Sequence, residues 1–286
     1  MPPEIVLVGH VARDLQPDGT YRLGGTVTYA ALLAERHALR VGICTSAPAA
    51  VVTELQALIP TASIHAVPAA TATIFENRYG PSGRVQYLRA RAIPLTAAHL
   101  PAEWCAVPIT LLGPIADEIA PDLAMALQGP VRAATPQGWL RVWDAAGRVS
   151  PTRWGSAASI VPTLTDLILS TEDLAIAAGG GDGASQVAGW AAQIPRVVLT
   201  DGARGATLWH QRGRTPTLAF PVTEVDPTGA GDTFACAYLI ALRQMGDPLA
   251  AMRYAHAAAS FVVQSPGTSG IPTPEMIAAR LTEWRT

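Results

Sequence analysis

The stretch Val225-Asp-Pro-Thr-Gly-Ala-Gly-Asp232, followed by the apolar run Thr233-Phe-Ala-Cys-Ala-Tyr-Leu-Ile-Ala-Leu242, carries the strongest structural signal in this chain. The apolar run predicts a helix, because it is rich in alanine and leucine and meets no helix breaker before Gly246. The Gly-Ala-Gly turn lets several N–H groups at the helix N-terminus face one point. Such a terminus binds anions without a cationic side chain, so we expect an anion site here.

Asp232 lies at the mouth of this predicted anion site, and two interpretations fit it. A carboxylate at this place is commonly an N-cap that accepts hydrogen bonds from the next turn. Beside N–H groups that hold a phosphate, it can also remove the proton from an attacking hydroxyl, which is the base role in phosphoryl transfer. The preceding Asp226-Pro-Thr228 is not needed for a cap and favours the catalytic interpretation.

Short apolar runs alternate with helical stretches along the chain. The runs predict strands buried on both faces of a mainly parallel sheet, at residues 5–8, 40–44, 109–112, 142–144, 167–169 and 196–200. Helices are expected between them, at 28–37, 50–58, 120–127 and 184–192. This alternation predicts an α/β fold. Residues 71–79 and 84–91, joined by Gly80-Pro-Ser-Gly83, instead predict a β-hairpin, either a flap over a site or an ordinary surface hairpin.

The composition excludes several classes of function. The 286 residues are 49% hydrophobic and 15% charged, and all 20 basic residues are arginine against 22 acidic residues. Without lysine, the chain lacks the phosphate loop that ends in Gly-Lys-Ser/Thr, the strand lysine of protein kinases and any Schiff-base chemistry. The near-neutral net charge of −2, without a basic cluster, argues against nucleic acid as a partner.

The chain is expected to be cytoplasmic. Cys44, Cys105 and Cys236 are widely spaced and odd in number, which favours reduced thiols over disulfides. The N-terminus enters a predicted strand directly, without a basic segment or cleavage signal. Apolar runs stay shorter than the roughly 18–20 residues that span a membrane, so no membrane partner is expected.

Asp226-Pro-Thr-Gly-Ala-Gly-Asp232-Thr-Phe234 resembles the second signature of the ribokinase-like (PfkB) carbohydrate kinase family. Weaker similarities follow in the family's order, at 9–14, 23–25, 200–205, 251–260 and 267–272. The resemblance implies one ribokinase-like domain over residues 1–286, with a three-layer α/β/α arrangement around a central mainly parallel sheet. It also implies a small β lid formed from about 10–24 and 71–93. Family lids are sometimes shared between subunits, so a homodimer stays open.

The resemblance also implies roles for single residues in an ATP-dependent kinase. Asp232 would be the general base, and the N–H groups of Gly229, Ala230 and Gly231 would form the anion hole for the γ-phosphoryl group. The expected nucleotide contacts are Thr200, Gly202 and Gly205 at the phosphates and ribose, with His256, Ala259 and Gly267 at adenine. The expected substrate contacts are Asp14, Gly24 and Gly25. Polyols also favour carboxylates and bidentate donors, which makes Glu118, Gln137 and Arg141 further candidates.

The expected metal ions come from the same resemblance. The family carries an Asn-x-x-Glu element whose acid helps to organise Mg²⁺ through water, and this chain has Ser170-Thr-Glu-Asp173 instead. Asp173 would take the place of the acid, or Glu172 after a shift of one residue. Asp226 and Thr228 would help to bind a monovalent cation such as K⁺.

The acceptor stays open between several classes. Leu23-Gly-Gly25, Thr73–Glu76 and Gln137–Asp144 resemble the inositol-kinase branch, which favours a small sugar or cyclitol such as myo-inositol. Nucleosides and sugar phosphates are alternatives, and a phosphorylated acceptor would use the lid arginines Arg78, Arg84, Arg89 and Arg91. A binding protein that senses nucleotide or sugar without catalysis is the alternative from another class, because the Asn-x-x-Glu element is altered.

Overall fold

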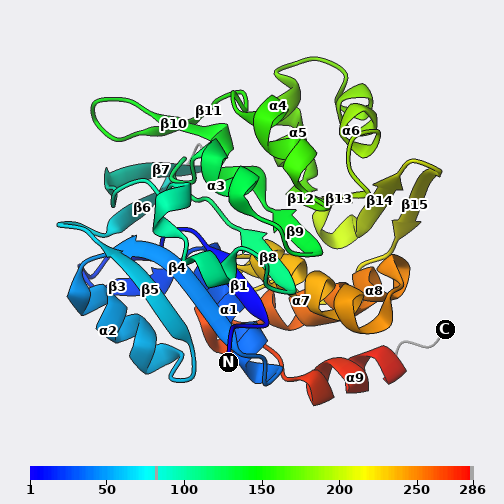
Figure 1. The fold of residues 1–286 in the computed structure, drawn as a ribbon, viewed down its shortest axis with the longest axis horizontal. Coiled ribbons are helices and arrows are strands. Elements are labelled where there is room, and N and C mark those ends of the chain that lie inside the picture. The colour runs from blue at the N-terminus through cyan, green and yellow to red at the C-terminus, as the bar shows by residue number, and fades with distance from the viewer. Residues whose placement is uncertain (81–82, 284–286) are drawn as a thin grey trace.

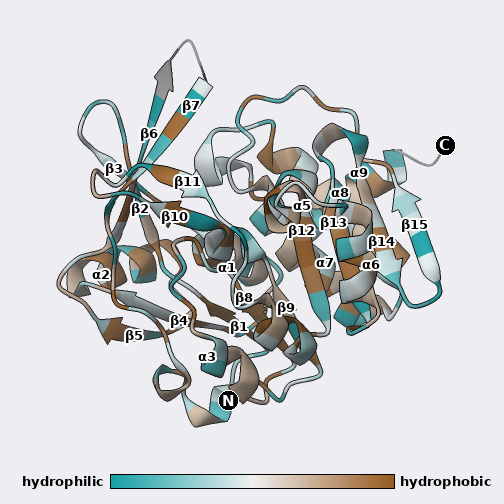
Figure 2. Ribbon diagram, turned by 90° about the horizontal axis from the view of Figure 1, so that it is seen from above, coloured by the Kyte–Doolittle hydropathy of each residue, from teal (hydrophilic) through white to brown (hydrophobic). Residues whose placement is uncertain are grey.

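A computed structural model of the chain describes residues 1–80 and 83–283. The predicted α/β class is confirmed, because a large, mostly parallel sheet lies between two layers of helices, with a smaller sheet at one end (Figure 1). Figure 2 shows hydrophobic residues concentrated on the strands of the large sheet. In the described ranges, no helix is both long and apolar enough to cross a membrane.

The large sheet has the strand order β15-β14-β13-β12-β9-β8-β1-β4-β5. Its parallel strands are β1 (Ile5–Val8), β4 (Val41–Ala47), β5 (Ser63–Pro68), β8 (Ile109–Leu112), β9 (Val131–Ala134), β12 (Asp166–Ser170) and β13 (Arg196–Thr200). The edge strand β15 (Gly213–Thr217) and the adjacent β14 (Ala206–His210) run antiparallel to their neighbours. The carboxyl ends of the parallel strands therefore meet at one edge, where α/β proteins place their sites.

Helices cover both faces of this sheet. One layer is formed by α1 (Thr26–Arg36), α2 (Ala49–Leu58), α7 (Ala230–Met245), α8 (Pro248–Val262) and α9 (Pro274–Glu283). The other is formed by α3 (Pro121–Ala126), α4 (Ala157–Ile160), α5 (Thr171–Ala178) and α6 (Gly183–Ala191). Strand β1 serves both layers, because Ile5 and Leu7 pack on the first and Val6 and Val8 on the second. Short 3₁₀ turns lie at 97–99, 102–104, 136–140, 161–163, 202–204 and 267–270.

The smaller sheet, which we call the lid, has the order β3-β2-β6-β7. Its strands are β2 (Ala12–Leu15), β3 (Tyr21–Gly24), β6 (Thr73–Gly80) and β7 (Gly83–Ala90). Strands β6 and β7 form the predicted hairpin, and β2 pairs with β6 in parallel. Of the predicted turn, Pro81 and Ser82 lie outside the described residues.

One predicted strand of the large sheet is wrong. Residues 142–144 do not join that sheet, because β10 (Arg141–Trp143) pairs only with β11 (Val149–Pro151) in an antiparallel hairpin. Val142 is half exposed there, so its β-branched side chain gave a misleading core signal. Four strands of the large sheet, β5, β9, β14 and β15, were missing from the prediction. The central one is β9, whose Val-Arg-Ala-Ala sequence is short, alanine-rich and interrupted by Arg132.

A buried ion pair joins β12 to β13 at the amino ends of these two strands. Asp166 is completely buried, and its carboxylate accepts from Arg196 Nε and Nη2 at 2.6 and 2.8 Å. It also accepts from Thr165 Oγ1 at 2.7 Å and from the Tyr238 hydroxyl at 3.3 Å. All these donors lose their acceptor together when the carboxylate is removed.

We predict that Asp166→Ala lowers the free energy of unfolding by about 3 kcal/mol, since it leaves a largely buried guanidinium without its partner. Urea denaturation measures this change. Glu4→Ala, which breaks the exposed pair of Glu4 with Arg40, is the control and should cost below about 1 kcal/mol. Equal effects of the two variants would contradict the burial seen at Asp166.

Candidate active site

A cavity of about 330 Å³ lies where the carboxyl ends of the parallel strands face the lid and the N-terminus of α7. It is lined from the lid by Ala12, Asp14, Phe75, Asn77, Arg84 and Gln86. From the strand ends and helix starts it is lined by Gly25, Thr26, Tyr29, Thr135, Gln137, Arg141, Ser170, Glu172, Asp173 and Thr200. Thr228, Gly229, Gly231 and Asp232 complete it at α7. The structure thus gathers most of the predicted catalytic and substrate residues around one space.

The N-terminus of α7 has the geometry of an anion site. Gly229 is its N-cap in the left-handed region (φ 79°), which a side chain would strain. Gly229 and Gly231 line the cavity, and neither N–H bonds to an acceptor within residues 1–80 and 83–283. The N–H of Ala230 instead donates to Pro227 O at 3.2 Å and closes the turn. The predicted trio of N–H donors is therefore reduced to two that face the cavity.

Asp232 stands in the first turn of α7 and is not an N-cap of that helix. Its Oδ1 accepts a hydrogen bond from Thr26 Oγ1 at 2.7 Å. Burial raises the pKa of Asp232, whereas the hydrogen bond from Thr26 and the charge of Arg141 act to lower it, and Asp173 acts to raise it. A carboxylate with a raised pKa is a stronger base, which suits removal of a proton from an alcohol.

Asp14 lines the cavity from the lid and Gly25 lines it beside the start of α1, whereas the predicted substrate residue Gly24 lies behind Asp14 and does not line it. Burial raises the pKa of Asp14 to about 6, although Arg141 and Arg84 act to lower it. A Cβ on Gly24 would lie 2.3 Å from Asp14 Oδ2, so only glycine leaves room for this carboxylate. Gly25 has φ 85°, and a Cβ there would lie 2.8 Å from His10 O. Gly24 thus leaves the space in which the Asp14 carboxylate lies, and Gly25 allows the close approach of the chain to His10.

Arg141 enters the cavity from the start of β10. Its guanidinium donates to Ile115 O at 3.0 Å and lies over the ring of Phe75, with its carbon 5.7 Å from the ring centre. The charges of Asp173, Asp232 and Glu118 act on it, while burial lowers its pKa. A buried guanidinium held in this way can bind two hydroxyls of one ligand.

Glu118 does not belong to the cavity, in contrast to its predicted role. It is completely buried, and its carboxylate accepts N–H bonds from His10, Ile115 and Ala116 at 2.7–3.0 Å. A carboxylate saturated by backbone donors organises the loops around it. Glu118 therefore shapes the cavity wall from behind.

The predicted magnesium residues have unequal roles. Ser170 and Asp173 form a capping box at α5, in which Asp173 Oδ2 accepts from Ser170 N and Oγ at 3.0 and 2.8 Å. Glu172 is exposed and lines the cavity. Within the described ranges no group of three or more His, Cys, Asp or Glu side chains could hold a metal ion. This donor set fits Mg²⁺ only where phosphates and water supply most ligands, as Mg²⁺ commonly requires.

Asp226 joins two loops through its carboxylate, and the cation expected at Asp226 and Thr228 stays a prediction. Its Oδ1 accepts from Thr228 N at 2.9 Å and its Oδ2 from Gly267 N at 3.0 Å. These hydrogen bonds lower its pKa against the opposing effect of burial. The contacts join the loop before α7 to the loop after α8.

The predicted nucleotide residues do not gather at the cavity. Thr200 lines it, but Gly202, Gly205, Ala259 and Gly267 do not. His256 is buried, its Nε2 bonds to Thr217 Oγ1 at 2.9 Å, and burial lowers its pKa to about 4. A neutral histidine already bonded to the protein is a packing residue of the α8 helix.

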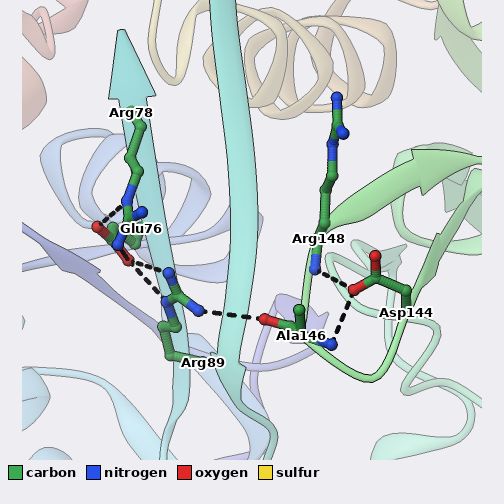
Figure 3. Close-up of polar contacts among 6 residues, drawn as sticks. All are labelled: Glu76, Arg78, Arg89, Asp144, Ala146 and Arg148. Atoms are coloured by element: carbon green, nitrogen blue, oxygen red, sulfur yellow. Dashed lines mark hydrogen bonds and ion pairs between the residues drawn. The ribbon is translucent and has the colours of Figure 1, made fainter.

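The lid arginines mostly face away from the cavity. Figure 3 shows Glu76 between Arg78 and Arg89, with nitrogen–oxygen distances of 2.5 and 2.6 Å. Arg91 donates to Asp117 O and lies over Trp143. Arg84 alone among the four predicted arginines lines the cavity. The expected cationic pocket for a phosphorylated acceptor is therefore not formed by this group.

Figure 3 also shows how the β10–β11 hairpin meets the lid. Arg89 Nη1 donates to Ala146 O at 3.2 Å. Beside this contact, Leu88 N donates to Gly147 O at 2.7 Å. Asp144 Oδ1 accepts from Ala146 N and Arg148 N at 2.9 Å and keeps the hairpin turn in shape. The free edge of β7 is thus covered by the hairpin that begins at Arg141.

Several cavity residues were missing from the sequence prediction. Thr135 follows β9, and its Oγ1 is buried without a hydrogen-bond partner in the described part of the chain. Asn77 and Gln86 face each other across the lid hairpin, where Gln86 Nε2 donates to Asn77 Oδ1 at 3.1 Å. Their position opposite each other on one face of the predicted hairpin was the available signal.

We predict that Asp14→Asn raises the free energy of unfolding at pH 7 by about 2 kcal/mol. The folded pKa of Asp14, about 6, lies above its unfolded value near 3.9, so the folded state binds this proton more tightly. The ionised carboxylate therefore costs stability, and the cost grows as the pH rises from about 4 to 6.

Urea unfolding at pH 7 and at pH 4 measures this difference, which should vanish at the lower pH. Asp18→Asn is the control, because Asp18 is an exposed lid carboxylate bonded to Thr20 and should give no gain. A variant no more stable than wild type at pH 7 would contradict a desolvated Asp14.

Comparison with solved structures defines the class of fold. A pyrophosphate-dependent kinase in the ribokinase family has a TM-score of 0.82 at 20% identity, over 96% of this chain and 99% of that chain. A pyrophosphate-dependent myo-inositol-1 kinase converted into a myo-inositol-3 kinase gives 0.81 at 19%, over 98% of both chains. Ribokinase from Thermotoga maritima gives 0.77 at 18%, over 98% and 100%. The chain therefore has the ribokinase fold.

Sequence comparison supports the family. Residues 147–276 match the profile described as pfkB family carbohydrate kinase, and the ribokinase-like resemblance is thereby confirmed over these residues. Ribokinase from Bacillus subtilis is 42% identical over 81 residues, which are 27% of each protein. The ATP-dependent ribose-1-phosphate kinase of Halopiger xanaduensis is 32% identical over 87 residues, 30% of this chain and 29% of that protein. These alignments span less than a third of either relative.

Proposed function

We propose that this protein is a kinase that transfers the γ-phosphoryl group of ATP to a hydroxyl of a small sugar or cyclitol, with myo-inositol as the first candidate. The carrying observation is Asp232 in the first turn of α7, in one cavity with the N–H groups of Gly229 and Gly231 and with Asp14. The ribokinase fold and the PfkB match support a phosphotransferase that acts on a sugar hydroxyl.

The residues suggest a division of work in the reaction. The acceptor hydroxyl would lie between Asp14 and Asp232, with Arg141 and Gln137 on other hydroxyls of the same ligand. Asp232 takes the hydroxyl proton while the oxygen forms its bond to the γ-phosphorus and the bond to the β-phosphate oxygen breaks. The N–H groups of Gly229 and Gly231 stabilise the negative charge on the transferred group.

Magnesium would be held near Ser170, Glu172 and Asp173, chiefly by phosphate oxygens and water, and supplies charge neutralisation of the phosphates when bound. A Cβ on Gly231 would meet no atom within 4 Å, which leaves room for a phosphoryl group against the helix N-terminus. Potassium at Asp226 and Thr228 stays a prediction, and no step of the proposed reaction uses it.

The proposal of a sugar or cyclitol as the acceptor rests on the residues that line the cavity and on the proteins of similar fold. Asp14, Arg141, Gln137, Asn77 and Gln86 offer acceptors and donors suited to adjacent hydroxyls. Two of the fold neighbours act on or bind myo-inositol according to their descriptions. Nucleosides and sugar phosphates remain the alternatives for the same fold.

We predict that Asp232→Asn lowers kcat by about 10²–10⁴-fold, because the amide cannot accept the proton while the shape of the site is kept. Coupled ADP detection measures kcat, and calorimetry with ATP checks that donor binding survives. Glu103→Gln is the control, since Glu103 is an exposed carboxylate outside the cavity and its loss should leave kcat unchanged. Turnover of Asp232→Asn within about tenfold of wild type would remove the base assignment.

Pyrophosphate is the second candidate donor. The cavity reaches Thr200 and Thr228 but is not lined by the residues expected at adenine, so it suits a donor that consists of phosphates alone. Three of the structures with the same fold are described as pyrophosphate-dependent kinases.

A panel of inositols, pentoses, hexoses, hexose phosphates and nucleosides, each with ATP or pyrophosphate, should therefore give turnover with a cyclitol or sugar. Mass spectrometry of the product identifies both substrates. Turnover with pyrophosphate alone would replace ATP as the donor. Tight ATP binding without turnover of any acceptor would instead favour a binding protein that senses nucleotide or sugar without catalysis.

A further inference from the structure

Thr26 contacts Asp232, the proposed general base, although the two residues lie 206 positions apart in the chain. It is the first residue of α1, it is 5% exposed, and its Oγ1 donates to Asp232 Oδ1 at 2.7 Å. We propose that Thr26 is a positioning residue that occupies Oδ1 of Asp232, so that Oδ2 is the oxygen that takes the acceptor proton. This inference rests on the proposed function, because it assigns the base of that same site.

Glycines at the strand ends bring Thr26 to this place. A Cβ on Gly113, directly after β8, would lie 2.4 Å from Thr26 Cγ2 and 2.5 Å from Thr26 Cβ. A Cβ on Gly9, directly after β1, would lie 2.5 Å from Gly113 O. The N-terminus of α1 can therefore approach the sheet only because these positions carry no side chain. The methyl group of Thr26 packs on Gly113 and orients the β-branched side chain, which leaves the hydroxyl facing α7.

The bond joins two helix N-termini that face the same cavity. Helix α1 begins at Thr26 after Gly25, and α7 begins at Ala230 after Gly229, both with a glycine of positive φ as the N-cap. The ring of Tyr29 fills the space that a Cβ on Gly229 would need, 2.1 Å from Tyr29 Cε1. Tyr29 packing and the Thr26 hydroxyl together fix where the carboxylate of Asp232 stands.

The charged groups around Asp232 act in both directions. Arg141 from β10 favours the ionised carboxylate, and Asp173 from α5 opposes it. Burial opposes it most, and the hydroxyl of Thr26 favours it. Tyr29 lies on the same turn of α1 and is neutral, because burial and the nearby carboxylates raise its pKa. Without the Thr26 hydroxyl, burial is opposed by Arg141 alone, and the pKa of Asp232 rises.

The test compares Thr26→Val, which keeps the shape and the methyl contact, with Thr26→Ser, which keeps the hydroxyl. In Thr26→Val the acidic limb of the kcat/KM profile should move up by about one pH unit, and kcat/KM below that limb should fall about tenfold. Thr26→Ser should keep the wild-type limb. Thr110→Val is the matched control, because Thr110 is a completely buried threonine on β8 whose Oγ1 has no partner in the described residues.

A second measurement separates this proposal from the proposed function. The Asp232 carboxyl carbon is followed by ¹³C NMR against pH in aspartate-labelled protein and assigned with Asp232→Asn. A midpoint that rises in Thr26→Val and stays in Thr26→Ser and Thr110→Val supports the pairing, even if the wild type phosphorylates no acceptor. An unchanged midpoint in Thr26→Val overturns it, whether or not the protein is a kinase. If Thr26→Val does not fold, Thr26→Ala takes its place in both measurements.

Discussion

The site depends on the close approach of the α7 N-terminus to helix α1, which tolerates no side chain at Gly229. The ring of Tyr29 lies where a Cβ would stand, and the left-handed backbone at Gly229 turns the chain into the helix. This contact places two unbonded N–H groups and the carboxylate of Asp232 at the carboxyl ends of the central strands. Because α7 is buried along most of its length, the rest of the first helical layer holds that terminus in place.

The absence of lysine has a structural counterpart in this site. An anion at the α7 N-terminus meets backbone donors, which cost no side-chain entropy and cannot lose a proton. Arg141 brings a cation into a cavity that carries Asp14, Asp173, Glu172 and Asp232. A guanidinium keeps its charge under such burial, whereas an ammonium shifts its pKa readily. Arginine therefore suits this place even though burial lowers its pKa.

Much of the fold could be predicted from the sequence, because apolar periodicity marks the buried strands and the glycine turn marks α7. The prediction missed β9, where the apolar pattern was weak, and also β5, β14 and β15, which are only partly buried. It also took the surface residue Val142 for a core position. In the site, Asp232 was predicted from the chemistry of its glycine-rich turn, whereas Asp14 and Gly25 were predicted from the family resemblance. Thr26 and Thr135 could not be found in this way, because their roles arise from contacts between elements distant in the chain.

Glu118 shows the converse error, in which the right residue type has another partner. A carboxylate near a predicted site looks like a ligand for hydroxyls, yet three backbone N–H groups of two loops reach it first. An acid in a loop that is buried in the fold must find donors, and backbone amides are the nearest supply. Sequence alone gives the need for a partner and not its identity.

The lid and the guanidinium of Arg141 are connected through the β10–β11 hairpin. Arg141 begins β10, and the turn of the same hairpin bonds to β7 through Leu88 and Arg89. The opposite face of β6 and β7 contributes Phe75, Asn77, Arg84 and Gln86 to the cavity. Arg141 also lies over the ring of Phe75. A displacement of the lid therefore either carries the guanidinium with it or breaks two contacts, the one between Arg141 and Phe75 and the one between the β10–β11 turn and β7. The position of the lid and the position of Arg141 therefore stabilise each other.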